Sequence, residues 1–196
     1  GTAGQIKVEG ITRPVNERQL RPGDVQAMAY QVMSQRQIDE FERDLEMNLA
    51  VSVSSKARFR VNVYYQRGEV SMVIRMIQST IPAIADLGLP AQLEKLAMLD
   101  RGLILIVGPA GSGKSTTLAA MLEHRNQQKS GHIVCIEDPI EFIHQHRLSV
   151  IDQREVGLDT HSVSDALRNV LREAPDVIML GESRDLDTMQ NALHYA

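Results

Sequence analysis

A glycine-rich segment at residues 108–115 constrains this chain more than any other feature. Its letters, G-P-A-G-S-G-K-S, fit the P-loop pattern G-x-x-x-x-G-K-[ST] without a mismatch. Glycines in such a loop let several backbone N–H groups point at one anion, and the helix that follows presents its positive end to the same anion. The segment therefore predicts a site for a nucleoside triphosphate, ATP in our interpretation, together with Mg²⁺.

The residues of the loop have separate expected roles. Lys114 supplies a charge for the β- and γ-phosphates, and the Ser115 hydroxyl is a candidate magnesium ligand. The predicted phosphate-binding residues are Gly108, Pro109, Ala110, Gly111, Ser112, Gly113, Lys114 and Ser115.

The chain around and after the loop alternates short apolar runs with helical segments. The apolar runs predict buried strands at Leu103–Val107, Ile133–Ile136 and Val177–Leu180. Helices are predicted at Thr116–Arg125, Val163–Glu173 and Asp187–Tyr195. Strand–helix alternation of this kind predicts an α/β fold with a parallel sheet that is covered on both faces.

The first ~80 residues have the pattern of a small α+β domain. A strand pair is predicted around Gly10, and two helices at Pro22–Met33 and Gln35–Asn48, with Leu45 on the apolar face of the second. Apolar residues then alternate with polar ones from Val51 to Ile77, around a predicted turn at Arg67-Gly68, which indicates a strand meander. The stretch Ser79–Leu89 is interpreted as a linker because it contains Pro82 and Gly88.

Carboxylates follow two of the predicted parallel strands. Glu137 and Asp138 come after Ile136, and Glu182 comes after Leu180. Ligands of open parallel sheets bind at the carboxyl ends of the strands, so these groups are expected beside the P-loop. One carboxylate would hold the magnesium shell, and another would orient or deprotonate the attacking water. Asp138 has a second interpretation, as a brace for the turn at Pro139.

Composition limits the remaining classes of function. A net charge of −4 disfavours nucleic acid as the main partner. No run approaches the ~20 apolar residues that a membrane-spanning helix needs. The single cysteine, Cys135, excludes an internal disulfide and is interpreted as a buried thiol. His144 and His146 have the spacing of metal ligands, but no third ligand lies near them in sequence, which disfavours zinc.

Long matching stretches give the chain a resemblance to the secretion and type IV pilus motor ATPases, in particular to the pilus retraction group (PilT- and PilU-like). The region 136–147 is more similar to the PilU type than to PilT. The matching segments lie at 102–121, 136–142, 153–160 and 166–185, with a further match, R-F-R-V-N-V, at 58–63.

This resemblance implies a domain organisation and a set of site residues. It implies a small PAS-like α+β N-terminal domain at 1–80, a linker at 81–89 and a partial RecA-like P-loop NTPase domain at 90–196. The run Gly108–Thr116 corresponds to the Walker A loop, with Thr116 as its last residue. Glu137 corresponds to the catalytic glutamate and Glu182 to a residue near the magnesium, which Ser115 would also ligate. Arg60 and Arg75 correspond to arginine fingers, although by sequence pattern alone each is a surface arginine.

The resemblance also implies what the protein does. Members of this family form hexameric rings of identical or paralogous subunits, hydrolyse ATP with Mg²⁺, and drive pilus retraction and twitching motility. They act in the cytoplasm, at the inner face of the cytoplasmic membrane, where a platform protein of the inner membrane is their partner. They contact the membrane only through such partners and do not act on nucleic acid.

Two alternatives and two departures accompany this expectation. The alternatives are an ATPase for pilus assembly or type II secretion, and an ATP-binding accessory ring subunit without turnover of its own. Ser183 stands where the family has Met or Ile before Arg-Asp, and the family continues beyond the position of Ala196. We therefore expect nucleotide binding from this chain, but not turnover or ring assembly by this chain alone.

Overall fold

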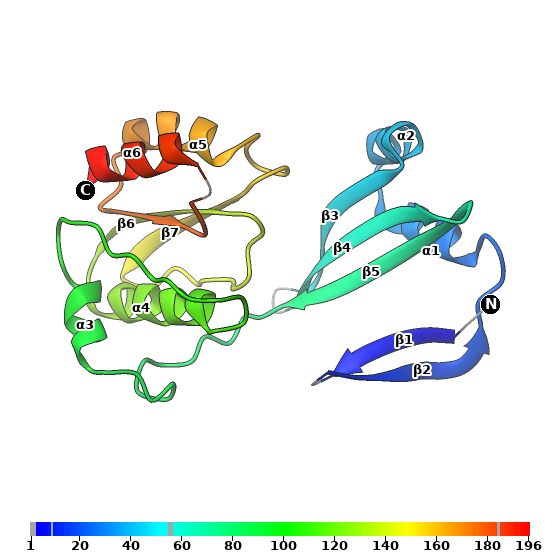
Figure 1. Cartoon of the computed structure of the whole chain (residues 1–196), viewed down its shortest axis with the longest axis horizontal. Helices are drawn as coiled ribbons and strands as arrows, with labels where there is room; N and C mark the ends of the chain where they lie inside the picture. Colours follow the sequence, from blue (N-terminus) through cyan, green and yellow to red (C-terminus); the bar gives the residue numbers. More distant parts are fainter. Residues whose placement is uncertain (1–2, 9, 55–56, 184) are drawn as a thin grey trace. The chain divides into compact units, whose positions relative to one another are not determined.

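The computed structural model of the chain describes residues 3–8, 10–54, 57–183 and 185–196 (Figure 1). Its internal contacts divide the chain into two compact units, Gly1–Met76 and Ile77–Ala196. The two units are described separately below.

The first unit contains a hairpin, two helices and a three-stranded sheet. Strands β1 (Ala3–Val8) and β2 (Ile11–Gln19) form an antiparallel pair, which is mostly exposed. The other elements are α1 (Asp24–Val32), α2 (Gln35–Asp44), β3 (Glu46–Ser54), β4 (Ala57–Gln66) and β5 (Glu69–Ile77). The sheet order is β3-β4-β5. The predicted turn at Arg67-Gly68 is confirmed, since both residues have positive φ angles, 51° and 80°.

The core of this unit lies between its helices and one face of the β3-β4-β5 sheet. Phe41 of α2 is fully buried there, with Met47, Leu49, Val61 and Val63 from the strands. Ser34 begins α2 with a capping box, because its hydroxyl accepts from the Gln37 N–H and the Gln37 side chain accepts from the Ser34 N–H.

The prediction that the second helix continues to Asn48 is wrong. Leu45 has a φ of 64° and donates its N–H to the Phe41 carbonyl at 2.8 Å, which ends α2 at Asp44. Residues 46–48 belong to β3, where Met47 pairs with Val63 across the sheet. Burial of Met47 and Leu49 at strand spacing outweighs the helical pattern, and Leu45 itself is 53% exposed.

The second unit is built on a parallel sheet with the strand order β7-β6-β8. Its elements are α3 (Gln92–Ala97), α4 (Lys114–Gln128), β6 (Gly131–Glu137), β7 (Ser149–Glu155), α5 (Val163–Val170), η1 (Leu171–Glu173), β8 (Val177–Leu180) and α6 (Leu186–Tyr195). The predicted strands at 133–136 and 177–180 and the three predicted helices are confirmed. Strand β7 was not predicted.

Helices cover both faces of this sheet (Figure 1). Ile133 and Cys135 of β6 pack with Leu122 of α4 on one face. Val134 and Ile136 pack on the other face with residues of α5, such as Leu167. Successive side chains of β6 therefore point to opposite faces of the sheet and contribute to two separate hydrophobic cores. Cys135 is fully buried, as predicted, and burial raises the pKa of its thiol well above the ordinary value.

The run Leu103–Val107 is not a strand, which corrects the sequence prediction. Its backbone joins none of the sheets, and exposure of its side chains reaches 85% at Val107. Only Ile106 packs into a core cluster, together with Ile84, Ala120 and Met121. Apolar composition alone does not make a strand, because a strand also needs a pairing partner, and this run pairs with neither β7 nor β8. The same cluster holds Ile84 at 2% exposure, so the stretch interpreted as a linker is packed against α4.

In the part of the chain that the structure describes, no helix combines the length and apolar character that crossing a membrane requires.

Truncation of Phe41 tests the core of the first unit. Its ring is fully buried and stacks on Tyr65 with the centroids 5.1 Å apart. We expect Phe41→Ala to lower the free energy of unfolding of this unit by about 3–5 kcal/mol, because it leaves a cavity. Urea unfolding followed by the NMR amide signals of β3 and β4 measures this change. Val53→Ala is the control, since Val53 is 72% exposed and its truncation should change stability by less than about 0.5 kcal/mol. Equal unfolding midpoints for both variants would contradict the prediction.

Candidate active site

The last two residues of the P-loop, Lys114 and Ser115, are the first two residues of helix α4. Gly111 and Gly113 have φ angles of 77° and 88°, a region that other residues rarely adopt, and Gly113 is the residue on which α4 begins. The hydroxyl and the N–H of Thr117 both bond to the Gly113 carbonyl, at 2.9 and 2.8 Å. The loop therefore leads directly into the positive end of a 15-residue helix.

The Lys114 side chain folds back over this loop. Its ammonium group donates to the Pro109 carbonyl at 2.9 Å. A lysine in this position carries its charge across the mouth of the loop, where an anion could take the place of the carbonyl.

A cavity of about 180 Å³ brings four of the predicted site residues together, whereas Thr116 and the loop residues from Gly108 to Gly113 do not line it. Lys114 and Ser115 of α4 line it, with Glu137 from the end of β6 and Glu182 from the segment after β8. The other lining residues are Leu118, Ala119, Asp138, Pro139, Glu141, Phe142, His144, Met179 and Gly181. Three segments far apart in sequence thus supply a lysine, a hydroxyl and carboxylates to one place.

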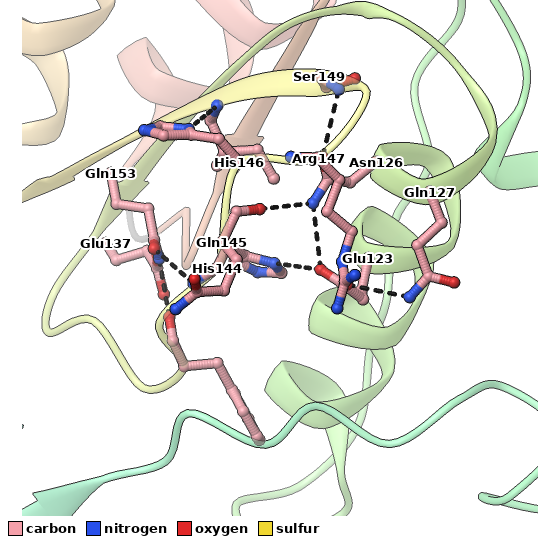
Figure 2. A network of polar contacts seen from close by, with 12 residues as sticks. Glu123, Asn126, Gln127, Glu137, His144, Gln145, His146, Arg147, Ser149 and Gln153 are labelled. Carbon is pink, nitrogen blue, oxygen red and sulfur yellow. Dashed lines mark hydrogen bonds and ion pairs between the residues drawn. The ribbon is translucent and has the colours of Figure 1, made fainter. Parts of the chain in front are cut away.

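Glu137 is the buried carboxylate of this cavity. It is 8% exposed, and burial raises its pKa to about 7 against opposing hydrogen bonds, of which the strongest comes from Gln153. The Gln153 amide donates to Glu137 Oε1 at 3.0 Å (Figure 2). Gly181 lies against the same side chain, since a Cβ at Gly181 would be 3.5 Å from both the Cβ and the Cγ of Glu137. At neutral pH this carboxyl group can both release and accept a proton.

Asp138 lies at the rim of the site. It is exposed, and it lines both the main cavity and an adjoining hollow of about 220 Å³, as Glu182 does. His161 and Asp185 also line the second hollow. The role of Asp138 stays a prediction.

A polar network lies on the side of the cavity formed by α4 and the segment 142–149 (Figure 2). Glu123 of α4 accepts from Arg147 at 2.5 Å and from Gln127 at 3.0 Å. Burial acts to raise the pKa of Glu123, but its hydrogen bonds outweigh burial and lower the pKa. Asn126, fully buried, donates to the Gln145 carbonyl at 2.7 Å. The network ties the P-loop helix to the wall of the cavity.

The two histidines of this segment are used within the network. His144 Nδ1 lies 3.5 Å from Glu123 Oε2, and burial lowers the pKa of the ring. His146 Nδ1 accepts from the Ile151 N–H at 3.1 Å. Among the described residues, no three His, Cys, Asp or Glu side chains are grouped so that they could hold a metal ion. Both histidine rings have contacts in this part of the structure, with Glu123 and with the Ile151 N–H.

The cavity fits magnesium held partly by a nucleotide. Mg²⁺ prefers oxygen ligands and is commonly bound by one or two protein groups together with phosphates and water. Ser115 and Glu182 supply a hydroxyl and a carboxylate to the cavity wall, beside Lys114. Two protein ligands are the number expected for a magnesium ion whose other ligands are phosphate oxygens and water.

Arg60 and Arg75 belong to the first unit. Arg60 lies in β4, half-buried, with Ala50 as its cross-strand partner, and Arg75 is exposed in β5. Their predicted role as arginine fingers stays a prediction.

The sequence reasoning missed Gln153 and the cavity-lining position of His144. Gln153 lies in β7, whose pattern is obscured because Ser149 and Glu155 are buried like the apolar Ile151. The available signal was position: Gln153 opens one of the segments, 153–160, that carried the family resemblance.

Comparison with known proteins gives the following relatives. A family model described as "Type II/IV secretion system protein" matches residues 5–196. "Type IV pilus ATPase PilU" of Pseudomonas aeruginosa is 47% identical over 196 residues, which are 100% of this chain and 51% of that protein. "Type IV pilus retractation ATPase PilT" of the same organism is 44% identical over 193 residues, which are 98% of this chain and 56% of that protein.

A solved structure is similar over the whole chain. It is described as "Crystal Structure of the Pilus Retraction Motor PilT and Bound ADP", with a TM-score of 0.94 and 45% identity. The match covers 100% of this chain and 57% of that one. This chain therefore spans about half the length of the relatives that it matches.

The raised pKa of Glu137 predicts a specific dependence of stability on pH. Because the folded pKa, about 7, exceeds the ordinary 4.5, this group contributes stability below pH 4.5 that is lost as the pH rises to 7. The loss amounts to on the order of 3 kcal/mol. We expect Glu137→Gln to be more stable than the wild type at pH 8, with a difference that shrinks toward pH 4.5.

Urea unfolding of the second unit across this pH range measures the difference. Glu94→Gln is the control, because Glu94 lies on α3, outside the cavity. If the free energies of unfolding of the wild type and Glu137→Gln changed with pH in parallel, burial would not raise the pKa of Glu137.

Proposed function

The chain belongs to the family of type II/IV secretion system proteins, and from this premise we propose that it hydrolyses ATP with Mg²⁺ as the motor subunit of type IV pilus retraction. One observation supports the proposal above the others. The P-loop residues Lys114 and Ser115 line one cavity with Glu137 and Glu182.

Each residue of the cavity has a role in the proposed reaction. The P-loop from Gly108 to Thr116 binds the phosphates through backbone N–H groups, and Lys114 neutralises the β- and γ-phosphates. Ser115 and Glu182 hold the magnesium ion, which when bound withdraws charge from the phosphate oxygens.

Glu137 acts as the general base. Water attacks the γ-phosphorus, its proton passes to the Glu137 carboxylate, and the bond to the β-phosphate oxygen breaks, which yields ADP and phosphate. A base works best with a pKa near the working pH, and the pKa of about 7 meets this condition.

The wider assembly follows from the proposed family role. We place a PAS-like domain in residues 1–80, a linker in 81–89 and part of a RecA-like ATPase domain in 90–196. Six copies, or copies with a paralogous subunit, would form a ring at the inner face of the cytoplasmic membrane. A platform protein of the inner membrane would be the partner, and the ring would act on no nucleic acid.

Retraction is preferred over the alternatives for two reasons. Both relatives described above bear the names of type IV pilus ATPases, and one name specifies retraction. A ring subunit without turnover is disfavoured because Lys114, Glu137 and Glu182 are all present. An assembly or secretion ATPase is the second candidate within the same family.

Two substitutions separate nucleotide binding from hydrolysis. Lys114→Ala should abolish binding of Mg-ATP, because it removes the charge at the mouth of the P-loop. Glu137→Gln should retain binding and lose hydrolysis by about 10²–10⁴-fold, the usual contribution of a general base. Calorimetric titration measures binding, and phosphate release measures turnover, both on this chain and on a longer form whose mass is checked by light scattering.

Lys95→Ala is the control for this pair, since Lys95 is exposed on α3 and should bind nucleotide like the wild type. Equal hydrolysis by Glu137→Gln and the wild type would remove Glu137 from its role. Absence of nucleotide binding by the wild-type chain would overturn the proposed function.

The proposed arginine fingers act on turnover and not on affinity. Arg60→Ala and Arg75→Ala should each lower the ATPase rate of the assembled ring, toward the loss of about 10³-fold or more seen for such groups, with nearly unchanged nucleotide affinity. Arg36→Ala, on the exposed face of α2, is the control. If both variants hydrolyse ATP like the control, the two residues are surface charges.

A further inference from the structure

The Gln153 amide forms hydrogen bonds with three residues that line the candidate site. It lies in β7, where the backbone of Gln153 pairs with Cys135 and the next residue but one, Glu155, pairs with Glu137. The Gln153 side chain reaches diagonally across to Glu137, and its Nε2 donates to Glu137 Oε1 at 3.0 Å. The same Nε2 donates to the Phe142 carbonyl at 2.8 Å, and Oε1 accepts from the His144 N–H at 2.9 Å.

These contacts permit only one orientation of the amide. A carboxamide has two N–H donors and one carbonyl oxygen, and both donors and the oxygen are used here. If the amide were flipped, its oxygen would face the Phe142 carbonyl and the Glu137 carboxylate, and its NH₂ group would face the His144 N–H. All three new contacts would be repulsive, so the network fixes which atom faces Glu137.

We propose that Gln153 is a positioning residue that holds the Glu137 carboxylate in the orientation needed to accept a proton from the attacking water, and ties it to the cavity wall at Phe142 and His144. This inference rests on the proposed function, in which Glu137 is the base. Gln153 itself is absent from the set of residues that line the cavity, so it acts through Glu137.

A neutral donor suits this position better than a cationic one. A lysine or arginine beside Glu137 would stabilise the carboxylate strongly and move its pKa well below the working pH. The amide stabilises the ionised form only in part, so burial still keeps the pKa near 7. Gln153 thereby fixes the direction of the carboxylate without removing its basicity.

The contacts with Phe142 and His144 also admit a purely structural role. Gln153 could hold the segment after β6 in place, with its contact to Glu137 as a by-product. This alternative predicts that loss of the amide disturbs the cavity wall as a whole, so that stability falls and KM rises together with the fall in kcat. The two roles therefore differ in a quantity that can be measured.

Gln153→Met tests the proposal, because methionine is neutral and of similar length but donates no hydrogen bond. We expect the pKa of Glu137, followed by ¹³C NMR of its carboxyl carbon and assigned by its loss in Glu137→Gln, to rise above the wild-type value. We also expect kcat to fall about tenfold or more, since a general base contributes about 10²–10⁴-fold, while KM changes little. The acid limb of the pH–rate profile should move to higher pH.

Gln127→Ala is the matched control. Its amide donates to Glu123 Oε1 at the same 3.0 Å, within the same polar network but without contact to Glu137. This variant should leave both the Glu137 pKa and the pH–rate profile unchanged.

Gln153→Leu is a second variant for the case that Gln153→Met does not fold. Leucine is neutral and cannot donate a hydrogen bond, so Glu137 loses its partner without a new charge beside it. An unchanged Glu137 pKa in a folded variant would overturn the proposal. If the longer form of the wild type hydrolyses no ATP, the proposed function fails by itself, and the NMR titration still decides whether Gln153 controls the Glu137 carboxylate.

Discussion

The burial of strand β6 on both faces is the constraint on which the candidate site depends. Four consecutive residues of this strand, Ile133–Ile136, are fully buried. Two of them pack against α4 and two against α5. Each such side chain stabilises the fold by about 1.5–3 kcal/mol, and a slip of one residue would exchange the two faces. The end of the strand is therefore fixed, and with it the position of Glu137.

The same burial gives Glu137 its chemistry. A carboxylate at the end of a doubly covered strand loses water, which raises its pKa, and it needs internal donors to be tolerated in ionised form. Gln153 on the neighbouring strand supplies such a donor, and Gly181 after β8 leaves room for the side chain. The proton affinity of the group thus follows from its place in the sheet, and no separate catalytic device is required to explain it.

The sequence predicted those parts of the fold whose signals are local. The P-loop, β6, β8 and the helices after them carry their own patterns, so their carboxylates could be assigned to one sheet edge in advance. Strand β7 was missed because the polar residues Ser149 and Glu155 occupy buried positions, which hides the alternation of a strand. Their burial is tolerated because both form hydrogen bonds that exist only in the folded chain. The run Leu103–Val107 was wrongly predicted to be a strand, because apolar composition does not determine whether a run pairs with a neighbouring strand. Gln153 could not be assigned a role without knowing the register of β7 against β6.

Polar side chains of α4 bond this helix, which begins in the P-loop, to two other segments of the second unit. Arg125 is 4% exposed and donates to the carbonyls of Ala97 and Leu99, at 2.9 and 2.8 Å. One turn of the helix thus bonds to the segment after α3 through Arg125 and to the segment 142–149 through Glu123 and Asn126. Buried hydrogen-bonded groups are costly to separate, since each would leave an unpaired partner. A displacement of α4 along its axis would have to break these bonds, so they hold Lys114 and Ser115, its first two residues, in place relative to the segment 142–149.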